Sequence, residues 1–200
     1  MTKTLTKLIK ITLVIVIVVL FFRVCYRSFA ADVAYKSAIA AIDNYDLPTA
    51  LDSADTAIKL NPEEPNYYRI QARIFLNYLP SKTLHEQQVI KRLVINDLQT
   101  AYNLNPKNLV TIRNIIPLYY FVAAKDITSV ASDKNIDPDF IKYTKDFYAS
   151  VKDYSPNDAG VYALVARYEK RLGLVNEYNA SVAKVRSLRP DLLDWYDSFR

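Results

Sequence analysis

Residues Ile11–Phe22 form an uncharged apolar run that constrains the fold of this chain more than any other segment. They read ITLVIVIVVLFF, and the run extends over the nineteen positions 8–26 with Lys10 and Arg23 near its ends. At about 1.5 Å per residue these positions span roughly 28 Å, close to the ~30 Å hydrocarbon core of a bilayer. The two basic side chains can extend toward the headgroups. The sequence therefore predicts one transmembrane helix at about residues 8–26, in contact with the lipid bilayer.

A cleaved signal peptide is the competing interpretation of this segment. A basic start, an apolar run of this length and small residues before a cut near Ala30 all fit such a signal. Arg23 and Arg27, however, lie between the apolar run and that cut, where signals usually avoid positive charge. We therefore expect a retained anchor, with a basic tail and transmembrane helix in residues 1–30 and a helical domain in residues 31–200.

The net charge of +5 reflects the anchor and not the rest of the chain. The 26 Lys and Arg residues face 21 Asp and Glu residues, and residues 1–30 hold five basic side chains and no acid. Subtracting those five leaves 21 basic and 21 acidic side chains in residues 31–200. The charge thus indicates membrane headgroups and not nucleic acid. Three lysines and the amino terminus precede the span against two arginines after it, which favours a cytoplasmic amino terminus and an extracytoplasmic domain.

The rare residues exclude several kinds of site. Gly160 and Gly173 are the only glycines, so neither a P-loop nor a dinucleotide-binding fingerprint is possible. One cysteine, Cys25, and one histidine, His85, cannot supply a Cys/His metal cluster, and we expect neither a metal nor a cofactor. Scarce glycine with abundant helix-forming residues predicts an all-α fold.

A short phrase ending in proline recurs four times after the apolar run. Each copy has the pattern of an amphipathic helix that proline stops, because proline lacks the amide hydrogen and clashes with the preceding turn. In the first copy Ala50, Ala54 and Ala57 place small side chains on one face, where another helix can approach closely. The copies are Ala57–Pro62, Ala101–Pro106, Val151–Pro156 and Val185–Pro190.

This pattern resembles the tetratricopeptide repeat (TPR) family, whose unit of about 34 residues is a pair of antiparallel helices. The last two closing prolines, Pro156 and Pro190, are 34 residues apart, and we assign the longer earlier intervals to loops near Leu79–Glu86 and Ala124–Pro138. The resemblance implies a solenoid of about four repeats plus a capping helix that starts in Asp191–Arg200. An irregular helical bundle is the alternative. The expected pairs are 31–44 with 47–61, 65–78 with 86–104, 108–124 with 138–154, and 158–172 with 174–188.

The sequence leaves open how the anchor joins the first pair. No Gly or Pro occurs before Pro48, so the spanning helix can continue into the soluble part as a stiff stalk. Alternatively, Ser28 or Asp32 caps a new helix.

The family register implies a concave surface lined by the first helix of each pair. Asparagine can bond to the backbone of an extended peptide, and arginine can bind carboxylates with two hydrogen bonds. The resemblance therefore implies a groove for an acidic or extended peptide segment, with solvated helix faces as the alternative. Its expected residues are Asn66, Arg69, Arg73, Asn77, Arg113, Tyr120, Arg167, Lys170 and Arg171.

We find no catalytic constellation and expect no enzyme. The acidic clusters, such as Glu63-Glu64 and Asp137 with Asp139, adjoin prolines at helix boundaries, where carboxylates favourably meet the helix dipole. His85 falls in an expected loop without an identifiable partner.

Three functions fit these observations. The first is a single-pass membrane protein that presents a TPR-like scaffold for protein–protein interaction in a membrane or cell-envelope complex. The second is a structural subunit whose transmembrane helix packs in a multi-protein complex, and the third is an exported soluble binding protein.

Overall fold

In a computed structural model, which describes residues 2–125 and 135–192, the chain folds into helices joined by turns. Consecutive helices pack as adjacent pairs, α1 with α2 through α7 with α8. The all-α expectation and the four expected pairs are thus confirmed. The helices are α1 Thr2–Asp43, α2 Leu47–Leu60, α3 Pro65–Tyr78, α4 Leu84–Leu104, α5 Leu109–Ala123, α6 Ile141–Tyr154, α7 Ala159–Arg171 and α8 Val175–Leu188, with the 3-10 turn η1 Leu79–Ser81 after α3.

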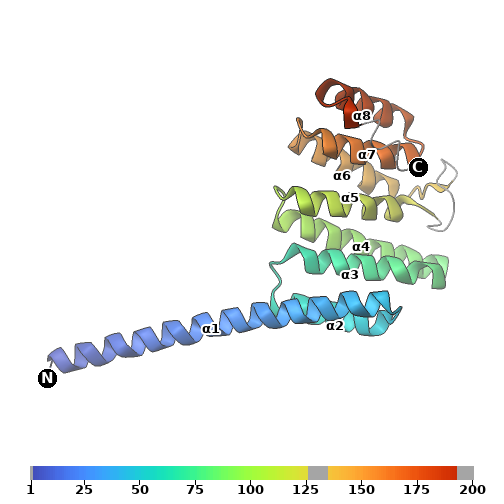
Figure 1. The fold of residues 1–200 in the computed structure, drawn as a ribbon. Coiled ribbons are helices and arrows are strands. Elements are labelled where there is room, and N and C mark those ends of the chain that lie inside the picture. The colour runs from blue at the N-terminus through green and yellow to red at the C-terminus, as the bar shows by residue number, and fades with distance from the viewer. Residues whose placement is uncertain (1, 126–134, 193–200) are drawn as a thin grey trace.

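Helix α1 continues without a break from the apolar run into the first pair, which decides between the two expected joints. It has 42 residues, and its amino-terminal half projects alone from the other helices (Figure 1). Asp32 does not cap a new helix. Its carboxylate instead accepts a 2.6 Å hydrogen bond from the hydroxyl of Tyr67 on α3.

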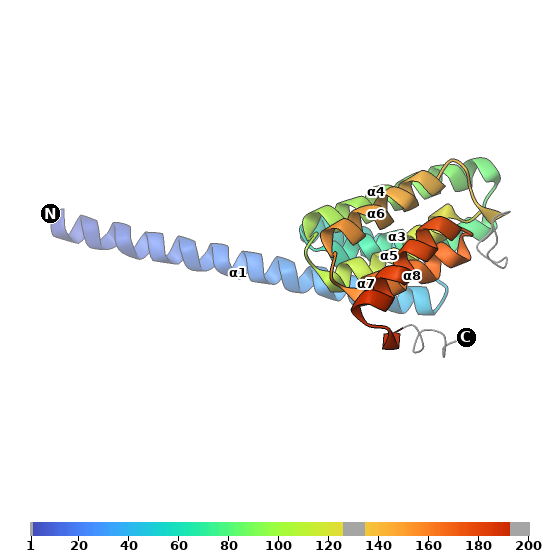
Figure 2. The same cartoon turned by 90° about the horizontal axis from the view of Figure 1, so that it is seen from above.

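The pairs stack one upon the next along a direction across the helix axes (Figures 1 and 2). The first helix of each pair touches the first helix of the following pair, so that α1, α3, α5 and α7 form a continuous layer. The second helices of the first three pairs, α2, α4 and α6, also contact the first helix of the following pair. A large apolar core runs from α3 to α7, and smaller clusters join α1 and α2 to α3.

Small residues allow α2 to approach its neighbours closely, as the sequence predicts. Ala50, Ala54 and Ala57 are each fully buried. Ala50 and Ala54 pack with Ile70 and Ile74 of α3, while Ala57 packs with a cluster at the start of the domain. Because alanine has a small side chain, the backbone of a neighbouring helix can lie close to α2 while the interface stays densely packed.

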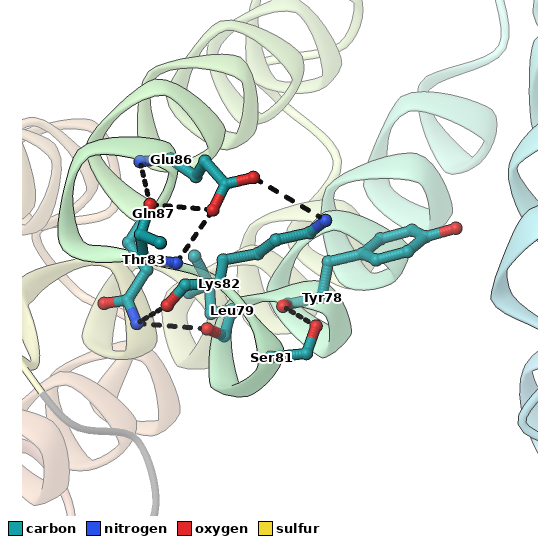
Figure 3. A network of polar contacts seen from close by, with 7 residues as sticks. All are labelled: Tyr78, Leu79, Ser81, Lys82, Thr83, Glu86 and Gln87. Atoms are coloured by element: carbon teal, nitrogen blue, oxygen red, sulfur yellow. Dashed lines mark hydrogen bonds and ion pairs between the residues drawn. The ribbon is translucent and has the colours of Figure 1, made fainter.

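A hydrogen-bonded turn, and not an open loop, joins α3 to α4 (Figure 3). Thr83 and Glu86 form a reciprocal capping box, in which the amide of Thr83 donates to the Glu86 carboxylate at 2.9 Å. Gln87 donates to the carbonyl oxygens of Leu79 and Lys82, at 3.1 and 3.0 Å. These bonds satisfy amide hydrogens and carbonyls that a helix end leaves without helical partners.

Two expected helix starts need correction. Helix α4 begins at Leu84 and not at 86, since Thr83 caps it, so that His85 lies in the first helical turn and not in a loop. Helix α6 begins at Ile141 and not at 138, because residues 138–140 form a turn. Most of the expected capping segment, including Trp195, lies outside the described residues.

The long connection between α5 and α6 is closed at its base by a buried lysine. Residues Ala124 and Ile136 form an antiparallel bridge. The ammonium of Lys91 on α4 donates to the carbonyl oxygen of Ala124 at 2.6 Å and to the Asp137 carboxylate at 2.7 Å. The aliphatic stem of Lys91 is enclosed too, since the residue is only 2% exposed. Asp137 therefore pairs with a lysine instead of capping a helix.

Candidate partner-binding surface and membrane span

The expected groove residues on α3 divide into a bonded group and a free group. Arg69 donates to the Asn66 side chain at 3.3 Å and to the Tyr35 hydroxyl of α1 at 3.2 Å. Asn66 also donates to Glu64, whose carboxylate caps α3. Arg69 and Asn66 thus stabilise the contact between α1 and α3, so their polar groups are already occupied.

Farther along α3, Arg73 and Asn77 are exposed. The guanidinium of Arg73 makes no hydrogen bond or ion pair with any residue in the described ranges 2–125 and 135–192. Asn77 donates to the Arg73 carbonyl at 3.0 Å, as in an ordinary helical turn. Both side chains line a hollow of about 450 Å³ between the end of α3 and the α1–α2 turn. The other lining residues are Ile42, Asp43, Tyr45 and Leu47.

Tyr45, at the rim of this hollow, combines backbone strain with exposure. Its φ of 58° lies in the left-handed region, and its side chain is 90% exposed. The turn ends α1 with two hydrogen bonds, from Tyr45 to the Ile42 carbonyl and from Asp46 to the Ala41 carbonyl, both 2.9 Å. Such a turn usually has glycine at the left-handed position. An aromatic side chain is therefore held in the open at an unfavourable backbone conformation.

The groove residues of the later pairs are mostly engaged within the molecule. Arg113 pairs with Asp158 at 3.1 Å, and Lys170 lies over the ring of Tyr178. Tyr120 is only 3% exposed, and the guanidinium of Arg171 lies 4.7 Å from its ring centroid. The ring of Tyr120 is thus not open to a ligand, because α5 buries it against α7 and Arg171 lies over its face.

Arg167 is the exception on α7, since it is exposed and makes no hydrogen bond or ion pair within the described part of the chain. Arg73 and Arg167 do not form one continuous row of free arginines, because Arg113, on the helix α5 between them, pairs with Asp158. Arg171, on the same helix as Arg167, lies over the Tyr120 ring. The strongest candidate surface is therefore the hollow beside Arg73.

A second hollow, of about 830 Å³, lies between the start of α5, the α6–α7 turn and the end of α8. Its two arginines, Arg113 and Arg189, are both paired with carboxylates, at 3.1 and 2.7 Å. Gly160 lies on its wall, where an added Cβ would stand 3.0 Å from the Arg113 guanidinium. The charges of this hollow are already balanced.

Buried charges that sequence reasoning missed lie between the helices. Glu169 is 1% exposed and accepts a 2.8 Å hydrogen bond from Lys152, which also contacts Ser181 of α8 at 3.4 Å. Asp97 is 6% exposed, and its Oδ2 has no hydrogen-bond partner. Burial first, and then the neighbouring Asp55 carboxylate, raise the pKa of Asp97 to about 7. Neither the amphipathic pattern of α4, which carries Asp97, nor that of α7, which carries Glu169, indicated these buried charges.

Within the described residues, no group of three or more His, Cys, Asp or Glu side chains could hold a metal ion. The acidic residue Glu64 caps α3, while Asp191 pairs with Arg189 at 2.7 Å.

The amino-terminal part of α1 is long and apolar enough to cross a membrane. Its most apolar window within Lys10–Asp43 has a mean hydropathy of 2.2, and none of that window is buried. The large apolar side chains from Ile11 to Phe22 are 45% to 65% exposed. After the apolar run, the first fully buried residue of α1 is Ala31.

A search against protein-family models and a comparison with curated proteins both find no match for this chain.

Proposed function

We propose that this protein is a single-pass membrane protein whose TPR-like helical domain binds another protein in a membrane or cell-envelope complex. The observation that carries the proposal is helix α1, which joins an exposed apolar span directly to a stacked domain with a free arginine at its surface. The partner contact is the hollow of Arg73, Asn77 and Tyr45, and its ligand is an acidic or carboxylate-ended peptide segment.

Retention of the span is supported by the packing at the predicted cleavage point. Ala31 is fully buried against Ala57 and Tyr67, and Asp32 accepts a hydrogen bond from Tyr67. A cut before Ala31 would place a charged amino terminus in this contact, where burial of an unpaired charge is costly. We therefore propose that the anchor stays attached. The excess of basic residues before the span favours a cytoplasmic amino terminus.

Peptide binding is supported by the chemistry of the hollow. The free guanidinium of Arg73 can donate two parallel hydrogen bonds to a carboxylate. Asn77 can bond to a peptide backbone, and the exposed ring of Tyr45 offers a rigid apolar surface with a polar tip.

The test is photo-crosslinking in native membranes. A photoreactive phenylalanine derivative replaces Tyr45, and the adduct is identified by mass spectrometry. We expect a specific adduct with one membrane-associated partner, which Arg73→Glu abolishes by repelling the ligand carboxylate. Arg92→Glu is the matched control, because Arg92 is exposed on α4 and lines neither hollow. Adducts that survive Arg73→Glu would exclude this hollow as the binding site.

The same membranes test the anchor. The full chain has a mass of 23.0 kDa and should resist extraction at alkaline pH. A chain that begins at Ala31 and appears in the soluble fraction would support the exported binding protein instead.

A further inference from the structure

The rigid joint at the start of the domain fixes which edge of the stack faces the span. Arg27 lies just after the end of the apolar run, and its guanidinium donates to the carbonyl oxygen of Lys59 at 3.3 Å. Lys59 is in the last turn of α2, which runs back along α1. The end of α2 is therefore level with the point where the apolar part of α1 ends.

Because successive helices run in opposite directions, every second turn lies at this same edge. The α2–α3, α4–α5 and α6–α7 turns are on the side toward which α1 projects, as the left edge of the stack in Figure 1 shows. The α1–α2, α3–α4 and α7–α8 turns lie at the opposite edge. When α1 crosses a bilayer, the first edge faces the headgroups and the second faces away.

The α4–α5 turn presents exposed apolar side chains at the edge near the span. Leu104 and Leu109 are each 38% exposed, and Val110 is 68% exposed. Between them lies Lys107, which is also exposed. Three apolar side chains around one lysine match the interfacial region of a bilayer, where apolar groups reach the acyl boundary and ammonium groups meet lipid phosphates.

Hydrogen bonds within the turn itself hold its shape. The Asn108 side chain accepts hydrogen bonds from the amides of Val110 and Thr111, at 2.9 and 3.2 Å. The Asn108 amide in turn donates to the carbonyl of Asn105 at 3.1 Å. The apolar side chains can therefore enter the interface while these bonds keep the turn in shape.

We propose that the α4–α5 turn, residues 104–110, lies in the headgroup layer of the bilayer that α1 spans. This inference rests on the proposed membrane anchor. The turn acts as a second, peripheral contact that stops rotation of the domain about α1. It also leaves the hollow at the α1–α2 turn directed away from the membrane, where a partner can reach it.

The experiment uses single-cysteine variants of the full chain in phosphatidylcholine–phosphatidylglycerol vesicles. Val110→Cys in a Cys25→Ser background carries a bimane fluorophore, and the vesicles contain lipids with a spin label on the headgroup. We expect strong quenching at position 110, and stronger quenching by the headgroup label than by a mid-chain label. Val110 and Cys25 are both exposed, so we expect the two substitutions to leave the fold intact. Circular dichroism checks the helix content of the variant.

Two controls separate failure of this inference from failure of the anchor. Leu84→Cys in the same background is the matched control, because Leu84 is 81% exposed at the opposite edge and should not be quenched. Bimane on the native Cys25 reports the span itself. Quenching at Cys25 without quenching at 110 would overturn the proposed contact and leave the anchor intact. No quenching at Cys25 would overturn the anchor and, with it, this inference.

Discussion

Tyr45 and Gly173 occupy the same kind of turn with opposite chemistry. Gly173 has a φ of 69°, and Leu174 donates to the Glu169 carbonyl at 2.9 Å, so that α7 ends as α1 does. At α7 the left-handed residue is glycine, which adopts this conformation without strain. At the end of α1 the residue is tyrosine, for which this conformation costs about 1 kcal/mol of steric strain.

We expect Tyr45→Gly to raise the free energy of unfolding by about 1 kcal/mol, because it removes this strain. The melting temperature should rise by about 2–4 °C. In a separate measurement, the same variant should weaken partner crosslinking from a photoreactive residue at position 77, because the exposed ring is gone. Circular dichroism in detergent measures the melting. Gly173→Ala is the converse control, and it should lower the melting temperature by a similar amount. A Tyr45→Gly variant that melts lower would show that the exposed ring stabilises the turn.

Asp97 makes the stability of the domain depend on pH. Its pKa rises from 3.8 in the unfolded chain to about 7 in the fold, so the folded state binds more protons between these values. Stability therefore falls as the pH rises from about 4 to 7. Asp97→Asn removes the buried charge, and we expect it to raise the melting temperature at pH 8 by several degrees.

The pH series supplies its own control. At pH 5 the folded wild-type chain already carries a protonated Asp97, so the gain of Asp97→Asn should be smaller there than at pH 8. An equal gain at both values would show that the effect comes from shape and not from charge.

At the scale of elements, Lys91 joins α4 to both ends of the long α5–α6 connection. Lys91→Met should lower the free energy of unfolding by about 3 kcal/mol, because it leaves the Asp137 carboxylate and the Ala124 carbonyl without their partner. Chemical denaturation in detergent measures this loss. The double variant with Asp137→Asn should recover part of it, since no unpaired charge remains. A double variant as unstable as the single one would refute coupling between the two charges.

Helix ends and the small-residue face were predictable because local rules decide them. Pro62 and Pro106 follow the last turns of α2 and α4, since proline cannot continue a helix. The i, i+4 spacing of Ala50 and Ala54 places both on one face, and the structure buries both. These features depend on residues only a few positions apart.

The features that the sequence did not predict depend on contacts between distant residues. The partner of Lys91 lies 46 positions away, and the bond between Tyr67 and Asp32 spans 35. In the candidate surface, Arg69 and Arg113 looked as free as Arg73, because their partners Tyr35 and Asp158 belong to other helices. The left-handed conformation of Tyr45 could not be predicted either, since tyrosine rarely adopts a positive φ.

At the scale of the whole molecule, the span can be tested separately from the domain. Replacing residues 11–22 with leucines preserves the length and hydrophobicity of the span but removes the side-chain surface that would pack specifically against other transmembrane helices. We expect the Tyr45-position crosslink to persist unchanged in native membranes, because the proposed scaffold needs only a lipid anchor. Loss of the crosslink in a chain that still inserts would favour the structural subunit, whose transmembrane helix packs against other helices.

The absence of a break in α1 has a mechanical consequence. At about 1.5 Å per residue the helix is roughly 63 Å long. In the proposed membrane arrangement it would pivot as one rigid rod at the membrane surface. A span adjusts its tilt when the bilayer becomes thinner or thicker. Since no hinge absorbs that angle, each change in tilt swings the distal hollow sideways by the same angle. In that arrangement, bilayer thickness would set how far the proposed binding site stands from a neighbouring complex.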